Sequence, residues 1–223
     1  MQIPTRSLGD NNNIPVLGLG TWKLQGAICE RVVKEALELG YNHIDTADIY
    51  KNHQQVSAAI KESRSSIFLV SKLWYEDHDP AKVEASLDRC LQELQTDYLD
   101  AYLLHWPNRK RDICGVIHQM RRMQEKGKVK AVGACNMTIH HLQDILNQGL
   151  SIDNLQIELH PFLVQQELTH FCAMQNIVVT AYSPLARGKA LENKLIQTIA
   201  TNHNAAPAAI VLAWGIHQGF VVI

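Results

Sequence analysis

The sequence predicts a (β/α)8 barrel, an α/β fold in which eight parallel strands and their connecting helices surround a core. Short apolar stretches recur along the chain, each ends in polar residues, and segments with helical periodicity separate them. Polar groups gathered at one end of many parallel strands describe the working face of such a barrel. The stretches of this kind are 43–50, 67–72, 102–107, 132–136, 155–160 and 178–183.

Residues 1–18 are expected to form a β-hairpin, because two short extended stretches flank Gly9-Asp10-Asn11-Asn12-Asn13, which favours a tight turn. The first barrel strand then starts at Leu17. The glycines of Gly18-Leu19-Gly20 do not form a G-x-G-x-x-G fingerprint. We therefore interpret them as small residues in a crowded barrel wall rather than as a phosphate-binding turn.

Strand and helix alternate over the rest of the chain. The predicted helices run from Gly26 to Gly40, around Val56 to Ile60, from Asp79-Pro80 past Leu94, from Ile113 to Gly127, from a Thr138 cap to Gly149, over about 166–174, and from Pro207 to Gly219. With a final strand at 220–223, this gives eight strands after the hairpin and seven helical connections.

We expect one domain over residues 1–223, because no linker rich in Pro, Gly or Ser divides the chain. An open doubly wound sheet is the structural rival, and it would need a Gly-rich turn after its first strand, which is absent. Since the chain ends on an apolar strand at Ile223, we expect a barrel that is C-terminally incomplete and lacks its last helix.

Composition excludes several classes of protein. A net charge of −1 and a pI near 6.8 give no electrostatic footprint for nucleic acid or an anionic membrane. No apolar run approaches the roughly 20 residues that span a bilayer, and the N-terminus lacks the apolar middle of a signal peptide. Five scattered cysteines without a Cys-x-x-Cys pair indicate free thiols and a cytoplasmic protein. We expect a monomer.

Asp45, Tyr50, Lys72 and His105 follow separate predicted strands, so they would meet in one barrel mouth. A tyrosine keeps its proton at neutral pH, and a nearby ammonium stabilises the phenolate left after donation. Asp45 would hold the lysine, and His105 could orient an oxygen beside the phenol. This set can protonate a carbonyl oxygen that receives a hydride. Taken singly, Asp45 and Lys72 could equally be a structural ion pair, whereas Tyr50 alone is more often a packed rim residue and His105 alone is more often a hydrogen-bonded core histidine.

No side chain donates hydride, so the chemistry requires a nicotinamide or flavin. Asn136 and Gln156 could bond a carboxamide from two sides, Tyr182 offers a flat ring, and Trp22 and Trp106 offer apolar walls. The alternatives are capping amides and plain packing. Glu158 and His160 are interpreted as structural.

We expect no metal site, because none of the 11 histidines has His-x-x-x-His spacing with a nearby carboxylate. The basic run 109–111 is interpreted as a solvated loop. The functional alternative is that it attracts an acidic substrate.

The chain resembles the aldo-keto reductase family along almost its whole length. The resemblance rests on Gly18-Leu19-Gly20-Thr21-Trp22, Asp45-Thr46-Ala47 with Tyr50, Ser71-Lys72-Leu73-Trp74, Leu104-His105-Trp106-Pro107, Asn136, Gln156-Ile157-Glu158-Leu159-His160-Pro161 and Ala181-Tyr182-Ser183-Pro184-Leu185.

This resemblance implies a barrel closed at its bottom by the hairpin, and reduction of aldehydes and ketones with NADP(H), with NADH possible. Asp45, Tyr50, Lys72 and His105 look like the catalytic tetrad, with Tyr50 as general acid. The cofactor positions implied are Gly20, Thr21, Trp22, Asp45, Cys135, Asn136, Gln156, Tyr182, Ser183, Pro184 and Leu185. The positions implied to face the small-molecule carbonyl substrate are Trp22, Tyr50, His105 and Trp106.

Short loops after His105 and Leu185 are similar to those of bacterial 2,5-diketogluconate and methylglyoxal reductases, and imply a wide pocket with broad substrate tolerance. Three departures stand out. Cys135 replaces the usual serine, and Lys51-Asn52-His53-Gln54 replaces the usual Gly-Asn-Glu pattern. The family's adenosine-phosphate-binding stretch would follow Ile223, so we expect weak NADP(H) binding.

Two other functions compete with the reductase. One is a nicotinamide-binding sensor or regulatory subunit with little turnover. The other is a barrel aldolase that forms a Schiff base on Lys72, which is disfavoured because a lysine paired with Asp45 stays charged and is a poor nucleophile.

Overall fold

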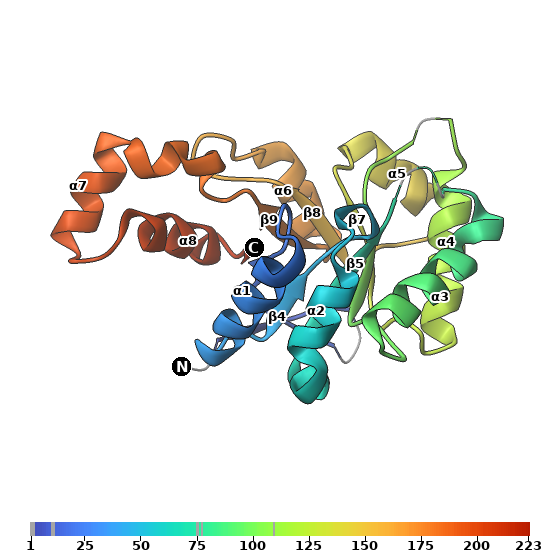
Figure 1. Ribbon diagram of the computed structural model, residues 1–223. Coiled ribbons are helices and arrows are strands. Elements are labelled where there is room, and N and C mark those ends of the chain that lie inside the picture. The colour runs from blue at the N-terminus through green and yellow to red at the C-terminus, as the bar shows by residue number, and fades with distance from the viewer. Residues whose placement is uncertain (1–2, 10–11, 75, 77, 109) are drawn as a thin grey trace.

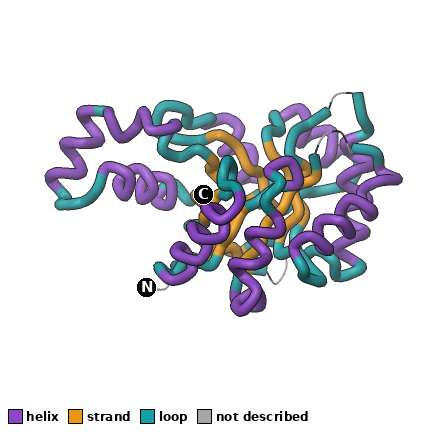
Figure 2. Tube along the Cα trace, in the orientation of Figure 1, coloured by secondary structure: helices purple, strands orange, loops and turns teal. Residues whose placement is uncertain are grey.

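The computed structural model describes residues 3–9, 12–74, 76, 78–108 and 110–223. The turn residues Asp10-Asn11 and the first residue of the basic run 109–111 lie outside the described part. Strands occupy the middle of the molecule and helices lie outside them (Figure 1, Figure 2). Helices α7 (Lys194–Asn202) and α8 (Pro207–His217), orange to red in Figure 1, extend to one side of the strands.

The predicted hairpin is present. Strands β1 (Thr5–Ser7) and β2 (Asn13–Pro15) pair antiparallel, with Thr5 opposite Pro15. Leu8 and Ile14 are buried in the same cluster as Phe68, Val70 and Leu103 of the barrel strands. The hairpin therefore inserts apolar side chains into one end of the barrel and covers that end.

Eight parallel strands follow, as predicted. In chain order they are β3 (Leu19–Gly20), β4 (His43–Asp45), β5 (Phe68–Leu73), β6 (Ala101–Leu104), β7 (Val132–Cys135), β8 (Asn154–Glu158), β9 (Val178–Tyr182) and β10 (Val221–Val222). Each pairs with its neighbour in sequence. A parallel bridge between Leu17 and Val222 joins the two ends of the sheet, with Gly18 N–H donating to Val222 O at 2.9 Å. This bridge closes the sheet into a barrel.

The helices lie outside the strands. They are α1 (Gly26–Glu38), α2 (His53–Ile60), α3 (Val83–Leu94), α4 (Ile113–Glu125), α5 (Ile139–Asn147), α6 (Gln166–Met174), α7 (Lys194–Asn202) and α8 (Pro207–His217), with 3-10 helices η1 (Asp48–Tyr50), η2 (Lys61–Ser66), η4 (Pro80–Lys82) and η5 (Ala186–Glu192). The predicted start at Asp79-Pro80 is confirmed, since the Asp79 carboxylate accepts from Ala81 N–H at 3.0 Å. At α5 the His141 ring accepts from Thr138 N–H at 3.2 Å.

Alternation along β5 decides which side chains face the barrel interior. Phe68 and Val70 belong to the interior cluster, whereas Leu69 and Leu73 pack against the helices. Lys72 therefore continues the interior row at the carboxyl end of the strand. The residue before it, Ser71, faces the helices.

The prediction of one domain over the whole chain stays a prediction. Within the part of the chain that the structure describes, no helix combines the length and apolar character needed to cross a membrane.

Candidate active site

All three hydrogens of the Lys72 ammonium have acceptors around it. They are the Asp45 carboxylate, the Thr46 carbonyl at 3.0 Å and the Tyr50 hydroxyl oxygen at 3.4 Å. Both Lys72 and Asp45 are buried. Burial alone lowers the pKa of Lys72, but the adjacent Asp45 carboxylate and Tyr50 raise it, and the net shift is upward. Lys72 is therefore a fixed cation at neutral pH.

The Asp45 carboxylate is held on both oxygens. Oδ1 accepts from Lys72, and Oδ2 accepts from the Gln156 amide at 2.8 Å. The Thr21 hydroxyl and N–H both donate to the Asp45 carbonyl, at 3.0 and 2.9 Å. Strand β4 is thereby joined to β3 and, across the barrel interior, to β8.

Tyr50 ends the 3-10 helix η1, which begins three residues after the end of β4. Lys51, immediately after it, has a left-handed backbone with φ of 55°, a conformation for which glycine is usual. Burial raises the pKa of the Tyr50 phenol, and the Lys72 charge acts in the opposite direction. The phenol keeps its proton at neutral pH.

The His105 ring lies between two other aromatic rings. It is edge-on to Tyr50 with centroids 5.6 Å apart and edge-on to Trp74 with centroids 5.3 Å apart. Burial, with the charge of Lys72, lowers the pKa of His105 to about 3. The imidazole is therefore neutral, and its Nδ1 is buried without a hydrogen-bond partner.

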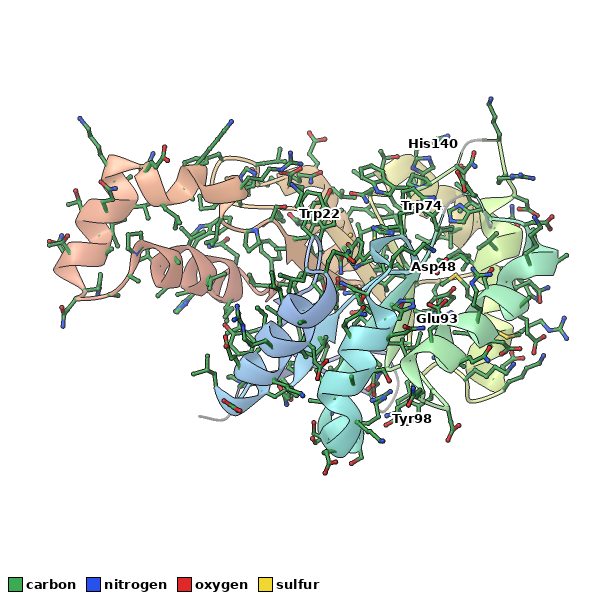
Figure 3. All side chains as sticks on the ribbon, in the orientation of Figure 1. Trp22, Asp48, Trp74, Glu93, Tyr98 and His140 are labelled. Atoms are coloured by element: carbon green, nitrogen blue, oxygen red, sulfur yellow. The ribbon has the colours of Figure 1, made fainter. Side chains whose placement is uncertain are left out.

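A cavity of about 770 Å³ opens at the carboxyl ends of the strands. Its lining includes 13 predicted site residues: Gly20, Trp22, Asp45, Tyr50, His105, Trp106, Cys135, Asn136, Gln156, Tyr182, Ser183, Pro184 and Leu185. Trp22 is 52% exposed and Trp106 46% exposed, so both indoles stand at the rim. Figure 3 places Trp22 and Trp74 on the same side of the molecule.

Two lining residues take left-handed backbone directly after their strands. Asn136 follows β7 with φ of 60°, and Ser183 follows β9 with φ of 49°. The Asn136 amide donates to the His105 carbonyl at 3.0 Å, and its oxygen accepts from the Tyr182 hydroxyl at 2.9 Å. Asparagine tolerates this backbone, whereas Ser183 is strained by it, and such strain concentrates at functional sites.

Two predicted residues do not line the cavity. Thr21 is fully buried, and its hydroxyl donates to the Asp45 carbonyl, so it stabilises the end of β4. Lys72 is likewise fully buried and reaches the site through Tyr50.

Sequence reasoning gave no site role to Asn52, Arg187 or Leu212. Asn52 is buried and joins the loops around the site, because its amide donates to the carbonyls of Thr21 and Leu24, both at 3.0 Å. Arg187 and Leu212 line the cavity from η5 and α8. The Tyr-x-Asn spacing could have indicated Asn52. No local sequence pattern indicates Arg187 or Leu212.

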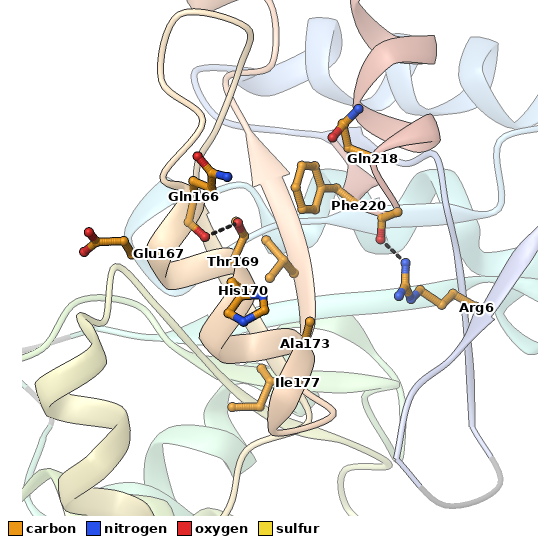
Figure 4. A pocket seen from close by; sticks show the side chains of 11 residues that line it. Arg6, Gln166, Glu167, Thr169, His170, Ala173, Ile177, Gln218 and Phe220 are labelled. Atoms are coloured by element: carbon orange, nitrogen blue, oxygen red, sulfur yellow. Dashed lines mark hydrogen bonds between the residues drawn. The ribbon is translucent and has the colours of Figure 1, made fainter.

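Elsewhere, a hollow of about 600 Å³ lies outside the barrel beside α6 and the turn from α8 to β10 (Figure 4). Arg6 closes one side by donating to the Gly219 carbonyl, and Thr169 donates to the Gln166 carbonyl at 3.0 Å. The predicted site residues do not line it.

Among the described residues, Asp48, His53 and Glu93 form a group whose ligand atoms lie within 4.8 Å of one another. Arg89 bonds Asp48 at 3.1 Å, and Lys51 lies 3.7 Å from it. Both cations pair with Asp48, and Glu93 is bonded to the His53 ring at 2.8 Å, so these contacts compete with a metal ion for the same ligand atoms.

A closed barrel with a cavity at the carboxyl ends of its strands, and with a phenol beside a buried ion pair, defines a barrel enzyme for small molecules. Residues 16–223 match the model of the aldo/keto reductase family. The chain belongs to this family and is an oxidoreductase.

Named relatives of the chain support its assignment to this family. Methylglyoxal reductase DkgA of Yersinia pestis is 38% identical over 228 residues, covering 99% of this chain and 81% of the relative. Glycerol 2-dehydrogenase (NADP(+)) of Saccharomyces cerevisiae is 38% identical over 253 residues, covering 97% and 80%. The crystal structure of an aldo/keto reductase from Brucella melitensis superimposes with a TM-score of 0.94 at 37% identity, covering 100% of this chain and 88% of that one.

Proposed function

We propose that this protein reduces aldehydes and ketones with NADPH, and that Tyr50 is the general acid. The observation that carries the proposal is the arrangement of the Lys72 hydrogens on Asp45, Thr46 and Tyr50. The Tyr50 oxygen accepts one of them, so its own hydrogen is left to donate. Because Tyr50 lines the cavity, that hydrogen is available to a bound carbonyl oxygen.

Lys72 makes the donation favourable. When Tyr50 gives up its proton, the phenolate forms 3.4 Å from a permanent ammonium. In raw Coulomb terms, with an effective dielectric constant near 20, this contact is worth roughly 5 kcal/mol. Asp45 holds the ammonium in place and keeps it charged. A charged Lys72 is a poor nucleophile, so the structure gives no support to a Schiff-base aldolase.

His105 serves as a neutral donor that orients the carbonyl. Its Nδ1 is buried with no partner, and an orphaned N–H costs more than an orphaned lone pair. The hydrogen is therefore best assigned to Nε2, the nitrogen left to bond a molecule in the cavity.

The cavity residues fit a nicotinamide. Among the described residues, Gln156 Oε1 accepts only from the Cys135 thiol at 3.9 Å, and Asn136 has a second amide hydrogen to spare, so both can bond a carboxamide. A Cβ added at Gly20 would meet no atom within 4 Å and would project into cavity space, which fits close approach of a ligand. The flat Tyr182 ring lies beside them. A bound nicotinamide supplies the hydride.

We propose NADP(H) as the preferred cofactor because the related yeast dehydrogenase carries NADP(+) in its name. NADH remains the alternative. For the substrate we propose small carbonyl compounds, since a related reductase is named for methylglyoxal and the rim tryptophans leave the cavity wide. Tyr50 and His105 would face the carbonyl, and Trp22 and Trp106 would wall it.

The test follows NADPH absorbance with methylglyoxal as the probe substrate and NADH in a parallel series. Steady turnover with NADPH supports the proposal, and faster turnover with NADH would overturn the cofactor preference. NADPH binding without turnover on methylglyoxal or a panel of simple aldehydes and ketones would favour the sensor function instead.

A further inference from the structure

Behind the site, the stretch after Tyr50 departs from the family pattern at His53, and this residue occupies an unusual position. His53 opens helix α2 and is only 2% exposed. Its Nδ1 lies 2.8 Å from Glu93 Oε2, and its Nε2 lies 3.0 Å from Ser71 Oγ. Both ring nitrogens therefore have partners, on two different elements.

These partners fix the direction of each bond. A carboxylate at Glu93 only accepts, so Nδ1 carries the hydrogen and Nε2 accepts from the Ser71 hydroxyl. Burial lowers the pKa of His53, although the two nearby carboxylates raise it. The ring is thus a neutral link between α3 and β5.

The link connects the two halves of the proton-donating pair. Ser71 immediately precedes Lys72 in β5. On α3, Arg89 lies four residues before Glu93, on the same helix face, and bonds Asp48 Oδ2 at 3.1 Å. Asp48 begins the 3-10 helix that ends at Tyr50. Figure 3 shows Asp48 and Glu93 close together.

We propose that His53 is a positioning residue: through Ser71 and Glu93 it holds strand β5 and the Tyr50 turn at the separation that brings the Lys72 ammonium to the Tyr50 oxygen. This inference rests on the proposed function. The Lys72–Tyr50 contact is sensitive to a further increase in distance, because 3.4 Å is already long for a charge-assisted hydrogen bond.

The experiment compares His53→Ala with wild type and with His43→Ala as the matched control. His43 is 1% exposed, and its ring bonds the Pro15 carbonyl at 3.1 Å, at the other end of β4 from the site. The His43→Ala variant therefore measures how much stability is lost when a buried histidine away from the site is removed. Turnover of methylglyoxal is measured at saturating NADPH across pH, below the unfolding temperature of every variant.

For His53→Ala we expect kcat to fall by about 10-fold, with KM for methylglyoxal changed less than about 2-fold. The alkaline limb of the kcat profile should move to higher pH, because a phenol farther from Lys72 is a weaker acid. His53→Gln can donate to Glu93 and accept from Ser71, so it should restore much of kcat. The His43→Ala variant should be less stable than wild type, with the alkaline limb of its kcat profile at the wild-type pH.

Ser71→Ala provides a second variant if His53→Ala does not fold, and we expect a smaller change in the same direction, about 3-fold in kcat. If His53→Ala or Ser71→Ala keeps the wild-type kcat and alkaline limb, His53 is structural only and the inference is overturned. An inactive wild type would instead defeat the proposed function, so the two failures are distinguishable.

Discussion

The Lys72 ammonium and the Tyr50 hydroxyl oxygen lie 3.4 Å apart, and the other two hydrogens of that ammonium are bonded to Asp45 and Thr46. The lysine is therefore a donor with no rotational freedom left, aimed at a phenol from a position that solvent does not reach. Under the proposed function, proton donation by Tyr50 depends on this contact.

Replacing Lys72 by Met should destabilise the fold, because it leaves the Asp45 carboxylate buried without its cation. Breaking a buried pair from one side costs about 3–5 kcal/mol. Urea unfolding measures the loss, and the double variant Asp45→Asn/Lys72→Met should lose less than the sum of the two single variants. Lys34→Ala, which breaks the exposed pair with Glu30, should change stability by about 0.5 kcal/mol or less.

The stability of the fold should fall as the pH is lowered from about 6.5 toward 3, because the pKa of His105 is lowered to about 3 in the folded chain. Between those values the unfolded chain binds the proton and the folded chain does not, so lower pH favours unfolding. At pH 5 this difference in proton binding lowers the free energy of unfolding by about 2 kcal/mol relative to its value at neutral pH. His105→Asn should lessen the loss between pH 7 and pH 5 in urea titrations. His140→Asn, at an exposed position, should not.

Tyr182→Phe removes the hydroxyl that donates to Asn136 at 2.9 Å and keeps the ring. The Asn136 amide is then less constrained, and one hydrogen bond of about 1 kcal/mol is lost. We expect the Kd for NADPH, followed by fluorescence titration, to rise about 5-fold. Tyr182→Ala removes the stacking surface as well and should weaken binding further, and equal effects of the two variants would contradict a role for the ring.

Gly20→Val tests whether the space beside Gly20 receives the cofactor. A Cβ at this position meets no atom within 4 Å, so the variant should fold with an unchanged melting temperature. Branched methyl groups would project into the cavity, and NADPH binding should weaken by at least about 10-fold. Normal NADPH affinity in Gly20→Val would mean that the cofactor lies elsewhere.

Most of the site could be predicted from the sequence because its signals are local. Asp45 ends a buried strand, Lys72 is the next-to-last residue of another, and His105 and Asn136 each directly follow one, and parallel strands bring these ends together. Thr21, expected among the cofactor positions, is buried, and its hydroxyl donates to the Asp45 carbonyl; its cofactor role stays a prediction.

Other features could not be predicted because their partners are distant in sequence or their pattern is weak. His53 and Glu93 are 40 residues apart, and only the packing of α2 on α3 brings them together. Helix α7 spans only nine residues and buries only Ile196 and Ala200, and no helix was predicted there. The connection between β9 and β10 therefore contains one more helix than the sequence predicted.

The central claim is that the Tyr50 hydroxyl delivers the proton to the carbonyl oxygen, and Tyr50→Phe tests it most directly. The change removes one oxygen and keeps the ring that lies against His105. In single-turnover reduction of methylglyoxal by pre-bound NADPH, the account predicts a rate at least about 100-fold below wild type, with NADPH affinity unchanged. A Tyr50→Phe variant that transfers hydride at the wild-type rate would contradict it.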